Sequence, residues 1–182
     1  RLSRPPVVAM GSPKGGVGGG GSVLAFKYND LASGWYPYGP TIQGWTSGGE
    51  AGYSISLSDN GSFMAVGSPK ASNLDRAANA GRTAVYFMVG SDWQLLGQEI
   101  HGEAEGDADG TSVATSKDGS VLVIGGKGHV MTSAGRCRVF HFQADRWQLQ
   151  HSIVGKSSEE RLGSSAAVSP DGNVVACGGV GG

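Results

Sequence analysis

The 182-residue sequence lacks several features that mark common classes of protein. Its 14 Lys+Arg and 15 Asp+Glu leave a formal net charge of −1, so no surplus of positive charge points to nucleic acid or to an anionic membrane surface. The longest apolar runs, such as residues 121–124, fall far short of the roughly 18 residues that a membrane-spanning helix needs. We therefore expect neither nucleic-acid binding nor membrane insertion.

Cysteine is also scarce, and no helical spacing of apolar residues is evident. Cys137 and Cys177 are the only two cysteines, and neither belongs to a C-x-x-C motif or a Cys/His cluster. Two cysteines are too few for a disulfide-stapled scaffold, and we expect no zinc site and no redox role.

Glycine, by contrast, is abundant, at 33 of 182 residues, or roughly 18% against a usual share near 7%. Many of these glycines belong to an internal repeat. Three segments align without a gap, and an apolar run ending in glycine follows each: 52–61 with 63–67, 110–119 with 121–125, and 163–172 with 174–178. A fourth apolar run lies at 7–11, and an alternating segment after three of the runs leads to Trp35, Trp93 and Trp147. We therefore interpret the glycines as architectural. The glycine run 15–21 is not interpreted as a phosphate loop, because no helix pattern and no Gly-Lys-Ser/Thr follow it.

Each complete repeat predicts four short strands, which in the second copy are 53–58, 63–66, 83–88 and 93–100. Asn-Gly or Asp-Gly pairs at 60–61, 118–119 and 171–172 favour tight hairpins between the first two strands. Four antiparallel strands in every ~55 residues are typical of a β-propeller blade. We predict an all-β partial propeller of thirteen strands, with a partial blade at 1–51, blades at 52–109 and 110–162, and a partial blade at 163–182. Cys137 and Cys177 then fall in neighbouring blades on unpaired strands, so their pairing stays open.

The repeat resembles the FG-GAP family in its Gly-x-Ser-Val-Ala segment at 110–114, its Val-Gly-Ser-Pro segment at 66–69 and its glycine-opened strands at 81–88 and 135–142. Similar repeats build the seven-bladed N-terminal propeller of integrin alpha subunits and many secreted surface proteins. The resemblance implies part of a seven-bladed ring, completed by further blades of the same longer chain or of another chain. It also implies an extracellular or cell-surface location.

The resemblance, together with the lack of a clustered catalytic set, favours a non-catalytic scaffold or adhesion propeller that binds a protein or glycan ligand. One alternative is a structural subunit of a cell-surface filament or appendage. A weaker one is the propeller domain of a hydrolase or lyase, because such enzymes gather carboxylates or histidines on the axis and the first strand of each blade carries none. The four histidines are scattered (His101, His129, His141 and His151). We expect no enzyme activity and no cofactor.

Calcium-binding members of the family carry an Asp-x-Asp-x-Asp-Gly loop, and the turns here are too short to encircle the ion. Glu105, Asp107 and Asp109 have ion-loop spacing, but no glutamate closes the loop. A solvated loop is therefore favoured over a calcium site. Asp109 also stands where the family has an aromatic residue.

Three further features are candidates for contact or modification. Tyr36, Tyr38 and Trp45 lie outside the repeat and form the candidate contact surface. The repeated tryptophans are interpreted as packing residues in preference to a sugar-stacking set. Asn60 begins an Asn-Gly-Ser glycosylation sequon on a turn expected to be exposed.

Overall fold

A computed structural model describes residues 5–44, 46–75, 77–128 and 134–181. Within these residues lie fifteen strands and one short 3-10 turn, η1 (Val17–Gly19). None of the helical segments in this part of the chain could span a membrane. The strands are β1 (Val7–Ser12), β2 (Ser22–Asn29), β3 (Gly34–Pro37), β4 (Ile42–Gln43), β5 (Ser54–Leu57), β6 (Phe63–Ser68), β7 (Arg82–Val89), β8 (Asp92–Leu95), β9 (Ile100–His101), β10 (Asp109–Thr115), β11 (Val121–Gly126), β12 (Arg136–Gln143), β13 (Arg146–Val154), β14 (Ser165–Val168) and β15 (Val175–Gly178).

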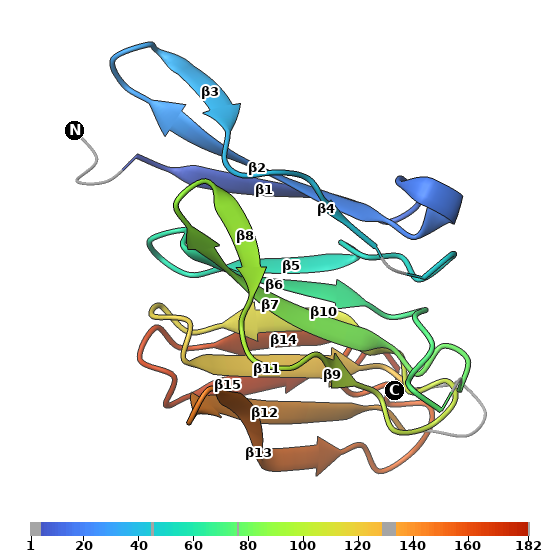
Figure 1. Cartoon of the computed structure of the whole chain (residues 1–182). Coiled ribbons are helices and arrows are strands. Elements are labelled where there is room, and N and C mark those ends of the chain that lie inside the picture. The colour runs from blue at the N-terminus through green and yellow to red at the C-terminus, as the bar shows by residue number, and fades with distance from the viewer. Residues whose placement is uncertain (1–4, 45, 76, 129–133, 182) are drawn as a thin grey trace.

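The strands form four antiparallel sheets that follow chain order. The first sheet holds β1 to β4, the second β5 to β9, the third β10 to β13 and the fourth β14 and β15. Figure 1 shows these sheets one upon another, from the blue sheet to the orange and red ones. Consecutive antiparallel sheets packed face to face are the blades of a β-propeller. The all-β partial propeller predicted from the repeat is confirmed.

The outer strand of two sheets departs from the prediction. We expected one strand over 93–100, but β8 and β9 pair separately with β7, and β3 and β4 do the same with β2. In the third sheet β13 runs unbroken beside β12, with a register shift between Val139 and Phe140. The thirteen expected strands become fifteen because the outer strand is divided in the first two sheets.

The core lies in three layers between consecutive sheets, because the second strand of a blade is buried on both faces. Met64 and Val66 of β6 pack toward the first sheet, whereas Ala65 between them packs toward the third. Likewise Leu122 of β11 packs toward the second sheet and Val123 toward the fourth. Alternation along a strand sends successive side chains to opposite faces. A strand without charges is therefore required there, as the apolar runs predicted.

The recurrent Gly-x-Ser segments join neighbouring blades. The Ser54 hydroxyl donates to the carbonyl of Gly110 at 2.8 Å, and the Ser112 hydroxyl donates to that of Gly163 at 2.9 Å. A Cβ on Gly67 would lie 2.2 Å from the Gly110 oxygen, so only glycine allows the two backbones to approach this closely. The architectural interpretation of the repeat glycines is confirmed at these positions. The segments also bring β5, β10 and β14 side by side, with their amino-terminal ends together.

The short turns between the first two strands use their carboxylates internally. Asp118 Oδ1 accepts bonds from the Ser116 hydroxyl at 2.7 Å and from the Ser120 amide at 3.0 Å. These hydrogen bonds hold the pKa of Asp118 below its usual value. Gly119 follows with φ +77°, as expected for this hairpin. In the second blade Asn60 makes the same bonds with Ser58 and Ser62.

Two buried tryptophans join one blade to the next. The Trp147 indole donates to the Leu96 carbonyl of the preceding blade at 2.9 Å, and Trp93 donates to the Tyr38 carbonyl at the same distance. Both indoles are buried, whereas Trp35 at the equivalent place in the first blade is 48% exposed. Packing is confirmed as the role of Trp93 and Trp147.

The structure shows whether the two cysteines pair, which the sequence left open. Cys137 of β12 and Cys177 of β15 form a disulfide, with their Cα atoms 6.4 Å apart. The bond crosses between the third and fourth sheets, where Cys137 is fully buried. No cysteine is free among the residues that the structure describes.

Candidate functional site

A pocket of about 500 Å³ lies where the loops of four successive blades meet. We call it the loop pocket and define it by the six side chains that shape its chemistry: Lys14, Glu50, Tyr53, Lys70, Lys127 and Arg161. The lysines come from the loops that follow the second strand of three blades, namely β1, β6 and β11. The other three come from the connections that enter β5 and β14. The pocket therefore lies at the amino-terminal end of the inner strands.

The backbone of the repeat places these side chains. Glu50 and Arg161 stand two residues before the repeat glycines Gly52 and Gly163, and Ala108 has the same place before Gly110. All three adopt positive φ, at 60°, 49° and 54°. A left-handed residue at the same point of each blade belongs to the architecture of the turn. What differs from blade to blade is the side chain presented, which is acidic in one, basic in another and small in the third.

Glu50 is the one carboxylate among the described residues that line the loop pocket. It is 7% exposed, and its Oε1 lies 2.8 Å from Lys70 Nζ. The hydrogen bond and the charge of Glu50 raise the pKa of Lys70. The pair therefore places the Glu50 carboxyl group at the pocket wall, with the Lys70 ammonium beside it.

The remaining cations of the pocket are not neutralised. Lys14, Lys127 and Arg161 have no ion pair with any residue in the described ranges. The Arg161 Nε is buried and has no hydrogen-bond partner there. A buried guanidinium nitrogen without an acceptor is costly. The pocket wall is therefore short of hydrogen-bond acceptors.

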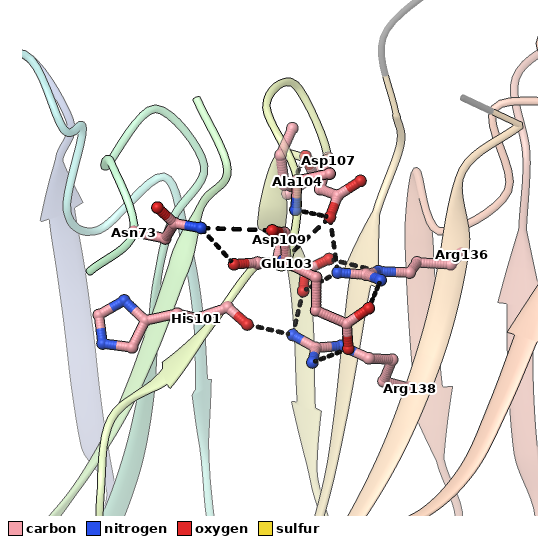
Figure 2. A network of polar contacts seen from close by, with 11 residues as sticks. Asn73, His101, Glu103, Ala104, Asp107, Asp109, Arg136 and Arg138 are labelled. Carbon is pink, nitrogen blue, oxygen red and sulfur yellow. Dashed lines mark hydrogen bonds and ion pairs between the residues drawn. The ribbon is translucent and has the colours of Figure 1, made fainter. Parts of the chain in front are cut away.

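Gly106 and Ala108 of the pocket lining alternate along the chain with Asp107 and Asp109, which belong to a buried ion network (Figure 2). Asp109 of β10 is fully buried and accepts hydrogen bonds from Arg138 and, at 3.2 Å, from Arg136 Nη2. The same Arg136 nitrogen donates to Asp107 Oδ2 at 2.8 Å, and Arg138 donates to the His101 carbonyl at 2.9 Å. The arginines of β12 thus hold the loop that enters β10 from the neighbouring sheet.

Burial and charge oppose each other in this network. Burial raises the pKa of Asp109, and the two arginines act in the opposite direction. The hydrogen bond from Arg136 lowers the pKa of Glu103, which is the outermost member. Burial and the nearby arginines also lower the pKa of His101. Because its charges are already paired, the network is a joint between blades and not an open site.

The three residues with ion-loop spacing, Glu105, Asp107 and Asp109, lie in different surroundings. Asp107 and Asp109 face the arginines, and two backbone amides also donate to Asp107 at 2.8 and 3.0 Å. Glu105 is exposed and takes no part in these bonds. Gly106 and Ala108, which alternate with the aspartates, line the loop pocket instead. In the described part of the chain, no group of three His, Cys, Asp or Glu side chains is placed to hold a metal ion.

The other candidate residues lie apart from the loop pocket. Tyr36 and Tyr38 line a separate groove of about 440 Å³ beside β2 and β3, where Tyr36 is 49% exposed and Tyr38 contacts Trp93 edge to face. Trp45 and His129 lie outside the described residues. Asn60 is exposed, and its Oδ1 accepts the turn bonds given above. Its glycosylation stays a prediction.

Neither the loop pocket nor the arginines of the network were predicted from the sequence. A signal for the pocket was present, because Lys14 and Lys70 each stand three residues after the repeat glycine of the apolar run. Arg136 and Arg138 occupy alternating positions on one strand, opposite the most acidic loop of the chain. Neither pattern repeats in every blade, and a search for repeated residues passes over both.

Comparison with known proteins gives fold matches alone. No family model and no curated protein matches the chain, so the FG-GAP resemblance stays a prediction. A candidate 6-phosphogluconolactonase of Bacteroides uniformis has a TM-score of 0.57 at 14% identity, over 98% of this chain and 48% of its own. The periplasmic gluconolactonase of Pseudomonas aeruginosa has a TM-score of 0.55 at 16% identity, over 95% of this chain and 46% of its own. Chaetomium thermophilum Sqt1 has a TM-score of 0.55 at 21% identity, over 94% of this chain and 38% of its own. The chain thus spans less than half the length of each.

These matches correct two expectations, the non-catalytic adhesion or scaffold propeller and the absence of enzyme activity. Two of the similar folds are described as lactonases, so the propeller arrangement gives no ground for excluding an enzyme. Acids and bases were expected only within the inner strands β5, β10 and β14, whereas Glu50 reaches the pocket from the connection that precedes β5. Because identity is low, the matches show the fold, and the reaction has to be argued from residues.

Proposed function

We propose that the chain is part of a hydrolase-type β-propeller that opens a lactone or a similar small ester in the loop pocket. The observation that carries the proposal is the ion pair of the buried Glu50 with the exposed Lys70 at the wall of a pocket that is otherwise cationic. A carboxylate can take a proton from water, and an adjacent cation stabilises an oxyanion. The lactonases among the similar folds support this class of reaction.

The proposed reaction uses few groups. Glu50 accepts a proton from water, and the hydroxide attacks the carbonyl carbon of the lactone. Lys70, which lies beside Glu50, stabilises the oxyanion of the tetrahedral intermediate. The ring C–O bond then breaks, and Glu50 returns the proton to the leaving oxygen, which yields a hydroxy acid.

Two expectations from the sequence accompany the proposal. Further blades, from the same longer chain or another chain, complete the ring and the second side of the pocket. The protein acts outside the cytoplasm, because a disulfide such as Cys137–Cys177 persists in an oxidising compartment. The periplasmic neighbour supports the same location.

The test is hydrolysis of glucono-1,5-lactone and of its 6-phosphate, followed with a pH indicator because each turnover releases an acid. We expect a rate above spontaneous hydrolysis, and Glu50→Gln should lower it by about 100-fold or more. Glu105→Gln makes the same change at an exposed glutamate and should leave the rate unchanged. A rate equal to the spontaneous one, or equal losses in the two variants, would refute the proposal.

A further inference from the structure

Positive charge is concentrated in the loop pocket and not over the chain as a whole. The chain has 14 Lys+Arg against 15 Asp+Glu. The pocket is lined by four cationic side chains (Lys14, Lys70, Lys127 and Arg161) and one carboxylate, Glu50. Since Glu50 pairs with Lys70, three cations are left without a counter-charge from the described residues. Like charges that share a pocket repel one another, so the arrangement favours a bound anion.

These three cations come from three different blades, which gives the pocket a defined geometry. Lys14 follows β1, Lys127 follows β11 and Arg161 precedes β14. Lys127 is half-buried, and Arg161 contributes the buried Nε that lacks an acceptor. An anion with several oxygens could bond to all three at once, whereas a neutral hydroxyl would leave the charges uncompensated.

The size of the pocket limits the ligand. A volume of about 500 Å³ suits a small molecule and not a polymer. A phosphate monoester carries about −1.5 to −2 charges at pH 7 and offers three strong acceptor oxygens. A carboxylate carries one charge and two oxygens. The phosphate matches three unpaired cations better.

We propose that the loop pocket recognises a phosphorylated small substrate, whose phosphate is held by Lys14, Lys127 and Arg161. This inference rests on the proposed hydrolase function and names the substrate class for the same site. In this arrangement the ester lies beside the Glu50–Lys70 pair, and the three unpaired cations hold the phosphate. Binding energy from the phosphate then positions the ester over Glu50.

Calorimetric titration tests the anchor with three probes: glucose 6-phosphate, glucose and inorganic phosphate. We expect glucose 6-phosphate to bind, inorganic phosphate to compete with it, and glucose to show no measurable heat. Lys127→Gln should weaken glucose 6-phosphate about tenfold, since a charge-assisted bond of this kind is worth about one decade in affinity. Lys117→Gln removes the same charge from an exposed turn at the other end of β10 and should leave binding unchanged. Equal binding of glucose and glucose 6-phosphate, or equal effects of the two variants, would overturn the anchor.

Kinetics separate this inference from the proposed function. If both lactones are hydrolysed with equal kcat/KM, the hydrolase stands and the phosphate anchor is overturned. If glucose 6-phosphate binds and neither lactone is turned over, the anchor stands and the hydrolase is overturned. If both hold, the phosphorylated lactone is preferred, and Lys127→Gln raises its KM about tenfold without changing the KM of the unphosphorylated lactone.

Discussion

Replacing Asp109 by asparagine tests how much the buried ion network stabilises the fold. The side chain of Asp109 is 1% exposed and that of its partner Arg138 is 5% exposed. In Asp109→Asn, Arg138 keeps its bond to the His101 carbonyl at 2.9 Å, and its one remaining ionic partner among the described residues is Glu103, at 3.7 Å. Removing one partner of a buried ion pair costs about 3–5 kcal/mol, because the other charge stays buried. Such a loss is a large part of the 5–15 kcal/mol that typically separates folded from unfolded protein.

Comparison with a second replacement shows where the cost arises. Arg136→Gln leaves Asp109 paired with Arg138, and Asp107 keeps its two backbone amides. We therefore expect a smaller loss, of about 1–2 kcal/mol. The double variant Asp109→Leu/Arg138→Met removes both buried charges together and should be closer to wild type than Asp109→Asn.

The assay is urea unfolding at pH 7, followed by tryptophan fluorescence, with the disulfide intact. Asp109→Asn and Arg136→Gln are each compared with wild type. Asp109→Leu, Arg138→Met and their double variant form a double-mutant cycle. The reasoning is refuted if Asp109→Asn costs less than about 1 kcal/mol. It also fails if the double variant loses as much as the sum of its two single replacements, because the charges would then not be compensating each other.

Three further predictions concern the joints and turns of the blades. Trp147→Phe should lower the free energy of unfolding by about 1–3 kcal/mol, because a buried carbonyl loses its donor, whereas Trp35→Phe at the exposed equivalent position should cost under about 0.5 kcal/mol in the same urea assay. Reduction of Cys137–Cys177, which closes a loop of 40 residues, should cost up to about 4 kcal/mol on the chain-entropy model; an unfolding midpoint unchanged by reductant would contradict this. The pKa of Asp118 is lower in the folded than in the unfolded chain, so its stabilising contribution is complete above the unfolded pKa and is lost as pH falls through the folded one. Asp118→Asn, which copies the natural turn of the second blade, should make stability less sensitive to acid below about pH 4, and an unchanged acid profile would count against the turn bonds.

The repeat predicted the fold because the same physical requirement recurs in every blade. A second strand buried on both faces must be apolar, so β6 and β11 can be identified from their sequence alone. Backbone contact between blades requires glycine, so Gly67 and Gly110 fall at fixed intervals. The division of the outer strand into β8 and β9 was not predicted, because it depends on how residues 96–99 meet the neighbouring blade.

The loop pocket could not be predicted in the same way. The fold depends on residues that are the same in every blade, whereas the pocket depends on side chains that differ between blades at equivalent loop positions. Glu50, Ala108 and Arg161 share one backbone conformation, and the repeat fixes that conformation without fixing the side chain. Their convergence depends on the stacking of four blades, which brings together residues more than 100 positions apart, such as Glu50 and Arg161. In a propeller of this kind, the residues that interrupt the repeat at its loop positions are therefore the first to examine for chemistry, and the residues that obey it are the first to examine for stability.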